Sequence, residues 1–309
     1  MAQTLGYKPN LAVRYLKTPR QVRVAVNLPA RIGTFFDAVR AGIRDAARPF
    51  QAGVDLQFRT HPALGEGEEE LFREALDDGS KGLIISAGHP GQLKVWIRKA
   101  AQKQVPVVCV ATDAPGTERL TAVSADSFVS GAMVAELLQL IVRGLGTVSI
   151  LTGDLSTFDH SEKVRGFKKS IDSLSGSLTI SSAVETHDDE AEAYNAAREL
   201  LTHDHSLKAI YVSTAKSIRI MQALEELDPE LRVALVTTDL FSQLVRHETC
   251  GARNGIAVNV GHSADNNSGL GLRCLRQLSR LRLSLESLQS ANADQECKHK
   301  PLHGATSCE

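Results

Sequence analysis

The sequence predicts an α/β fold made of two parallel-sheet, Rossmann-like subdomains. Short apolar, β-branched runs alternate with stretches whose apolar residues recur at helical spacing, and this rhythm continues from residue 22 to residue 237. The run at 82–86 is almost continuously apolar, which is typical of a strand buried on both faces of a parallel sheet. The chain has 309 residues, and the number of strand-helix units exceeds what one sheet holds comfortably. We therefore expect two similar subdomains.

Each element follows from its local spacing. Alternating β-branched residues predict the first strand at 22–28, and apolar residues at i, i+3 and i+4 predict a helix at 35–48, with Thr34 placed to cap it. Gly79 ends the helix at 66–78. The remaining predicted strands lie at 54–59, 82–86, 105–111, 147–151, 177–184, 209–212 and 233–237, and the remaining helices at 92–103, 129–143, 163–174, 191–203 and 217–227.

The alternation changes character between residues 122 and 130, where we place the subdomain boundary. The predicted division is an N-terminal segment at 1–20, subdomains at 21–124 and 125–246, and a tail at 247–309. The tail is rich in Ser, Asn and Arg and holds four of the five cysteines. We interpret the tail as divergent from the fold, either frame-shifted or disordered.

Charge and hydropathy limit the classes of partner. A net charge of −1 excludes a globally basic protein, so nucleic-acid affinity is expected only at the basic N-terminal segment. No apolar run approaches the roughly 18 residues that a membrane span needs. The first ten residues also lack an apolar signal core. We therefore expect a cytoplasmic protein without a membrane partner.

Residues 5–17 predict a short basic helix that starts near Pro9. The sequence Leu-Gly-Tyr-Lys-Pro-Asn at 5–10 resembles the segment before the hinge helix of the lactose-repressor (LacI) family; an ordinary amphipathic helix is the alternative. The resemblance implies DNA contacts from Tyr7, Asn10, Arg14 and Leu16, with the leucine wedged between base pairs of the minor groove. The helix-turn-helix that precedes this segment in the family has no counterpart here, so we expect no direct base readout by this chain.

The resemblance extends to about residue 239 and implies a periplasmic-binding-protein type I core whose ligand lies beyond the carboxyl ends of the strands. It places paired aromatics, Phe35 and Phe36, near a sugar ring, although at least one is expected in the core. It also matches Asp113 to a cleft aspartate that accepts hydrogen bonds from vicinal hydroxyls. The alternative for Asp113 is an exposed loop residue before Pro115.

Further ligand candidates follow the later strands. Asp126 is expected either to contact ligand or to cap the next helix. Lys163, in the sequence Lys-Val-Arg-Gly-Phe at 163–167, stands where the family carries a ligand-binding arginine. Because lysine lacks the planar fork of arginine, the preferred ligand is expected to differ from simple hexoses. The other candidates are Asp159, His160 (alternatively a polar loop residue), Thr214 and Asp239.

No P-loop, Gly-x-Ser-x-Gly elbow, His-Glu-x-x-His or dinucleotide-binding motif occurs in a suitable context, so we predict a binding protein without a cofactor rather than an enzyme. The Cys297, His299, His303 and Cys308 spacing fits no familiar zinc module, and no metal is expected. We predict a homodimeric, ligand-responsive transcriptional regulator with a sugar or polyol effector and operator DNA as partners. The alternative is a sugar-binding protein of a transport system; an enzyme that uses Asp113 and Asp239 as acid and base is more distant.

Overall fold

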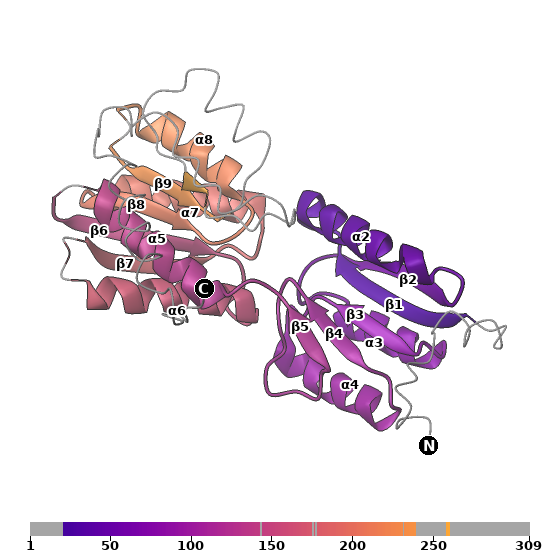
Figure 1. Cartoon of the computed structure of the whole chain (residues 1–309). Helices are drawn as coiled ribbons and strands as arrows, with labels where there is room; N and C mark the ends of the chain where they lie inside the picture. The colour runs from indigo at the N-terminus through magenta and orange to yellow at the C-terminus, as the bar shows by residue number, and fades with distance from the viewer. Residues whose placement is uncertain are drawn as a thin grey trace, which may run out of the picture.

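The computed structural model describes residues 21–142, 144–174, 176, 178–230, 232–238 and 258–259. In this part of the chain, two parallel sheets of five strands each form two lobes (Figure 1). The chain passes from one lobe to the other between β5 (Thr121–Val123) and α5 (Ser127–Ile141). The predicted α/β class with two parallel-sheet subdomains is confirmed.

The first lobe has the strand order β2-β1-β3-β4-β5. Helix α2 packs Phe36 against Val26 and Leu28 on one face of the sheet, whereas α3 and α4 pack Phe72 and Leu93 on the other. Its remaining elements are β1 (Val22–Pro29), α2 (Gly33–Ala47), η2 (Arg48–Phe50), β2 (Val54–His61), α3 (Glu68–Asp77), β3 (Gly82–Ile85), α4 (Pro90–Gln102) and β4 (Val107–Val110).

The second lobe has the strand order β10-β9-β8-β6-β7. Successive side chains of β8 alternate between its faces: Tyr211 packs in the cluster with α5 and α6, while Ile210 and Val212 pack with α7 and α8. Its remaining elements are β6 (Gly146–Thr152), α6 (Phe158–Ser173), β7 (Leu178–Glu185), α7 (Glu190–His203), β8 (Leu207–Val212), α8 (Ser217–Leu227), β9 (Ala234–Thr237) and β10 (Val258–Asn259).

Three local predictions differ from the structure. Helix α2 already begins at Gly33, after Ile32 turns the chain with φ 64°, so the predicted cap at Thr34 is wrong. Strand β5 was not predicted, because three residues are too short to show a period. Helix α6 begins at Phe158 rather than at 163, since its polar first turn hides the apolar spacing. This difference moves His160 from a loop into a helix.

The segments 1–20 and 247–309 lie outside the described residues, except for β10. Val258 and Asn259 pair in parallel with Val236 and Thr237 of β9, so the second sheet takes a strand from beyond residue 246. Of the helices in the described ranges, none combines the length and the apolar character needed to cross a membrane.

Cys109 offers a test of packing in the first lobe. The residue is fully buried in β4, and burial, together with the Asp113 charge, raises the pKa of its thiol to about 11. Because the thiolate is the reactive form, we expect iodoacetamide at pH 8 to leave Cys109 unmodified in the native chain and to alkylate it in denaturant. Peptide mapping by mass spectrometry checks this. Rapid native alkylation of Cys109 would contradict the packing.

Candidate functional site

Each sheet reverses its strand order once, and the reversals identify where a ligand fits. The first sheet reverses between β1 and β3, and the second between β6 and β8. Loops after such neighbouring strands leave in opposite directions and open a crevice, which is the usual ligand position in open α/β sheets. The loops concerned are 30–32, 86–89, 153–157 and 213–216. We call the region where they meet the interlobe site.

Hydrogen bonds join the two lobes at this site. The hydroxyl of Thr157 donates to the carbonyl oxygen of Gly88 at 3.0 Å. The hydroxyl of Ser156 lies 2.5 Å from Nδ1 of His89, and Nε2 of the same ring lies 3.7 Å from Oδ2 of Asp154. The two loops at the reversal points therefore touch directly through polar groups.

Two further hydrogen bonds cross between the lobes. The backbone N–H of Asp159 donates to the hydroxyl of Thr112, which follows β4, at 3.3 Å. The guanidinium of Arg31, after β1, donates to the carbonyl oxygen of His187, after β7, at 3.3 Å. Loops from both sheets thus contribute to one continuous polar interface.

Lys163 and Asp159 form a buried ion pair on the first turns of α6. Nζ of Lys163 lies 2.8 Å from Oδ2 of Asp159 and donates to the carbonyl oxygen of Ser213 at 3.4 Å, while the Ser127 hydroxyl donates to the other carboxylate oxygen. Burial opposes the charge of Asp159, but Lys163, His160 and the hydrogen bonds hold the pKa of that carboxyl below its usual value. The site thus contains a fixed acceptor beside a fixed donor.

Asp113 is occupied by its own loop. Both carboxylate oxygens accept from Arg119, and one also accepts the N–H of Ala114 at 2.6 Å. Arg119 first, and then the N–H of Ala114, outweigh burial and lower the pKa of Asp113. The Asp113 side chain is only 13% exposed, so it is not the exposed loop residue that the alternative expected.

Three further predicted ligand residues have defined contacts in the structure. Asp126 caps α5, because its carboxylate accepts the N–H of Val129 at 3.0 Å. His160 is buried in the first turn of α6, 3.1 Å from the carbonyl oxygen of Asp154, so the alternative of a polar loop residue is wrong. Thr214 is buried in the loop after β8 and donates to Asp188.

Phe35 and Phe36 lie in different surroundings, and one of them is in the core, as expected. Phe36 is 2% exposed and belongs to the core, while Phe35 is half-buried and contacts it edge to face, with ring centroids 5.1 Å apart. Phe35 is therefore the better candidate for stacking on a sugar. Asp239, Tyr7, Asn10, Arg14 and Leu16 lie outside the described residues.

Sequence reasoning missed several polar groups at the strand ends. His89, Asp154 and Thr157 contact the other lobe, and a Gly-His-Pro sequence directly after an apolar strand was a usable signal for the first of them. Asn27, near the end of β1, and Ser86, after β3, are buried with no hydrogen-bond partner for their side chains among the described residues. Buried polar groups normally have a partner, so both are candidates to meet a ligand or water.

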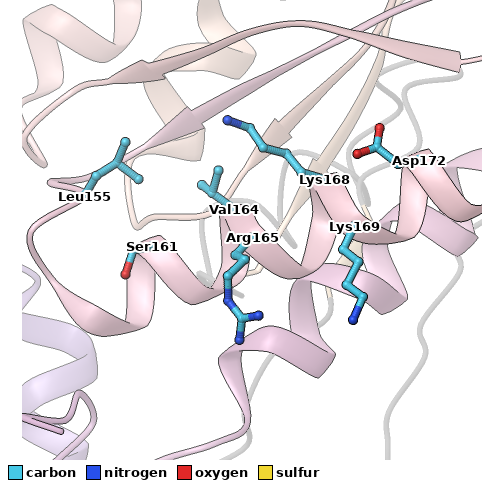
Figure 2. A pocket seen from close by; sticks show the side chains of 7 residues that line it. All are labelled: Leu155, Ser161, Val164, Arg165, Lys168, Lys169 and Asp172. Atoms are coloured by element: carbon cyan, nitrogen blue, oxygen red, sulfur yellow. The ribbon is translucent and has the colours of Figure 1, made fainter. Parts of the chain in front are cut away.

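A groove with a cavity volume of about 510 Å³ lies along α6 (Figure 2). Its lining residues are Leu155, Ser161, Val164, Arg165, Lys168, Lys169 and Asp172. None of the predicted ligand residues lines this groove, but Leu155 belongs to the loop 153–157, so one end of the groove adjoins the interlobe site.

Residues 24–247 match the periplasmic binding protein domain family. The chain belongs to this family. Catabolite control protein A of Priestia megaterium is 25% identical over 213 residues, which are 69% of this chain and 62% of that protein. The protein of the same name from Staphylococcus epidermidis is 27% identical over 165 residues, 53% of this chain and 48% of its own length. The chain therefore spans less than two thirds of the curated relatives it matches.

Solved structures of the periplasmic binding protein class share the fold. GanP of Geobacillus stearothermophilus, described as a glucose-galactose binding protein, has a TM-score of 0.69 at 23% identity, over 77% of this chain and 84% of its own. A solute-binding protein of Burkholderia graminis, solved with D-arabinose, has a TM-score of 0.70 at 22% identity, over 78% and 83% of the two chains. At these identities the likeness establishes the fold alone.

Proposed function

We propose that this chain is the effector-sensing core of a cytoplasmic, LacI-type transcriptional regulator and that its effector is a sugar or polyol. The observation that carries the proposal is the interlobe site, where loops from both sheet reversals meet through hydrogen-bonding groups. The relatives named as catabolite control proteins favour a regulator. Binding requires no bond to be made or broken, so we propose no enzymatic step.

The chemistry of the site suits vicinal hydroxyls. A sugar hydroxyl both donates and accepts, and the site offers the Asp159 carboxylate, the Lys163 ammonium and the hydroxyls of Thr112 and Thr157. Phe35 supplies an apolar surface for a ring face. In this proposal Asp113, Asp126, His160 and Thr214 shape or contact the same site, and Asp239 stays a proposed ligand residue.

The proposed mechanism is a shift between two lobe arrangements. A ligand that contacts both lobes binds the closed arrangement more tightly than the open one, and this difference in affinity shifts the population towards the closed arrangement. In a homodimer, closure changes the spacing of the paired N-terminal segments, whose Tyr7, Asn10, Arg14 and Leu16 contact operator DNA. Sugar binding then changes the affinity for DNA, and DNA binding changes the affinity for the sugar by the same factor.

Thermal unfolding tests the sugar proposal. We expect one class among pentoses, hexoses, polyols and sugar phosphates to raise the melting temperature, because a ligand at about 100 times its Kd stabilises the folded state by about 2.7 kcal/mol. Thr112→Val removes a hydroxyl from the site and is expected to weaken binding about tenfold. Thr121→Val, at an exposed position of β5, is the matched control. A cooperative transition that no class shifts would refute the proposal.

A sugar-binding protein of a transport system is the second candidate, because structural neighbours are described as solute-binding or sugar-binding proteins. Titration of random-sequence duplex DNA with the purified chain at low salt, with and without the sugar, distinguishes the two, because phosphate and minor-groove contacts need no direct base readout. Duplex binding that the sugar changes supports the regulator. Sugar binding without any duplex binding supports the transport protein.

A further inference from the structure

The buried side chain of Glu68 joins two loops of the first lobe. Glu68 is the first residue of α3 and is 7% exposed. Its Oε1 accepts the N–H groups of Gly65 and Gly88, both at 2.8 Å, and its Oε2 accepts the N–H of His89 at 3.3 Å. Hydrogen bonds from backbone N–H groups to a carboxylate are stronger than those to a neutral acceptor. One side chain therefore holds the loop before α3 against the loop after β3.

The backbone around Gly88 is packed too closely to take a side chain. A Cβ atom at this position would collide with the backbone of Leu64 and Gly65 and would lie 2.6 Å from Oε1 of Glu68. Pro90 begins α4 directly after this loop. Little space therefore remains for Gly88 to take another position while Glu68 is in place.

The loop that Glu68 holds carries first-lobe groups that meet the second lobe. The carbonyl oxygen of Gly88 accepts a hydrogen bond from the Thr157 hydroxyl at 3.0 Å, and Nδ1 of His89 lies 2.5 Å from the Ser156 hydroxyl. Hydrogen bonds weaken steeply when their distance and angle depart from the optimum. A displacement of this one loop would therefore weaken both contacts between the lobes.

We propose that Glu68 is a positioning residue for the interlobe site. Its carboxylate fixes the backbone of Gly88 and His89, and these residues present a carbonyl oxygen and a ring nitrogen to the second lobe. Without the carboxylate, the loop is released and the closed arrangement of the lobes is less populated. This role in lobe contact requires no ligand, whereas any effect on sugar affinity rests on the proposed function.

Single-molecule Förster transfer tests the proposal in the full chain without any sugar. The dyes are attached to azidophenylalanine at positions 103 and 199, which are exposed on different lobes. We expect Glu68→Ala to lower the ratio of closed to open molecules about fivefold, the effect of losing about one hydrogen bond. Glu68→Gln keeps an acceptor oxygen for the two shorter hydrogen bonds and should restore the ratio to within about twofold of the wild type.

Asp228→Ala is the matched control. Asp228 is also a buried carboxylate that accepts a backbone N–H, that of Val233 at 2.8 Å, but it lies before β9, at the end of the second sheet away from the interlobe site. This variant should be less stable and should keep the wild-type ratio. Gly88→Ala displaces the same loop by a different route and should lower the ratio, in case Glu68→Ala folds poorly.

A wild-type ratio in folded Glu68→Ala or Gly88→Ala would overturn the proposal, and so would a Glu68→Gln chain that is no closer to the wild type than Glu68→Ala. Because no sugar is present, this result stays readable if the sugar proposal fails. Lobes that respond as expected in a chain that binds no sugar would support the role of Glu68 and refute the sugar proposal alone.

Discussion

Gly131→Ala is expected to lower the free energy of unfolding by about 3 kcal/mol, although alanine is the better helix former, because its methyl group overfills a helix crossing. Gly131 of α5 faces the backbone of α6, where a Cβ atom would lie 2.8 Å from the carbonyl carbon of Lys163 and closer still to its oxygen. Gly166 of α6 meets the carbonyl of Phe128 in the same way. The two glycines therefore let the helices cross backbone to backbone.

The obstacle at Gly131 is main chain, so relief requires one helix to move. Such a shift disturbs Val134, Leu138 and Phe167, which are buried between these helices and the second sheet. It also moves Asp159 of α6 away from the Ser127 hydroxyl of α5 at the interlobe site. We expect Gly166→Ala to have a similar effect. In both variants the second lobe should unfold at a lower urea concentration than the first.

Urea unfolding followed by circular dichroism measures this effect. Gly42→Ala is the matched control, because Gly42 lies inside α2 and a Cβ atom there meets nothing within 4 Å. It should stabilise the chain by up to about 1 kcal/mol. A Gly131→Ala chain as stable as Gly42→Ala would show that α5 and α6 do not cross as closely as described.

The apolar patterns made most of the fold predictable. Successive side chains of a strand such as β8 pack against helices on opposite faces of the sheet. Both faces of the strand are therefore apolar, and a continuous apolar run predicts a buried strand. Elements were missed or shortened where burial left no pattern. β5 has three residues at a sheet edge, and the first turn of α6 is polar because it faces the interlobe site rather than the core.

The sequence predicted where candidate site residues lie along the chain, but not which side chains they contact. The end of a predicted strand indicated where Thr214 lies, because parallel strands present their carboxyl ends at one edge, whereas the family resemblance of residues 163–167 indicated Lys163. The sequence did not reveal that Asp113 pairs with Arg119, or that Thr214 donates to Asp188, since these contacts depend on how loops fold. Contacts between lobes, such as that of His89, require both sheets in place.

The sequence Lys-Val-Arg-Gly-Phe at 163–167 shows how one motif combines two roles. Its resemblance suggested a ligand-binding cation, and Lys163 does lie at the interlobe site. Its glycine is explained by packing instead, because Gly166 contacts the backbone of α5. Phe167 stacks on Tyr211 with ring centroids 5.0 Å apart, so the last residue belongs to the core.

Lys163→Met is expected to destabilise the chain by about 3 kcal/mol at pH 7, because it leaves the buried Asp159 carboxylate without its main counter-charge. The Lys163 residue is only 8% exposed, and the Asp159 side chain 17%. Asp159→Asn should cost a similar amount, since it leaves the ammonium in the same low-dielectric place. The double variant, which removes both charges, should be more stable than the sum of the two losses predicts.

The pH dependence separates loss of the ion pair from loss of packing. In the native chain the pKa of Asp159 is lowered, so its stabilising contribution is present above the ordinary aspartate pKa and is lost as the pH falls through the folded value. Without Lys163, burial dominates and raises the pKa of Asp159, so the variant takes up a proton instead of holding a buried charge. The stability deficit of Lys163→Met should therefore shrink between pH 7 and pH 4 in urea titrations. A deficit that stays constant over this range would mean that methionine simply packs less well than lysine, and that the ion pair does not stabilise the interlobe site.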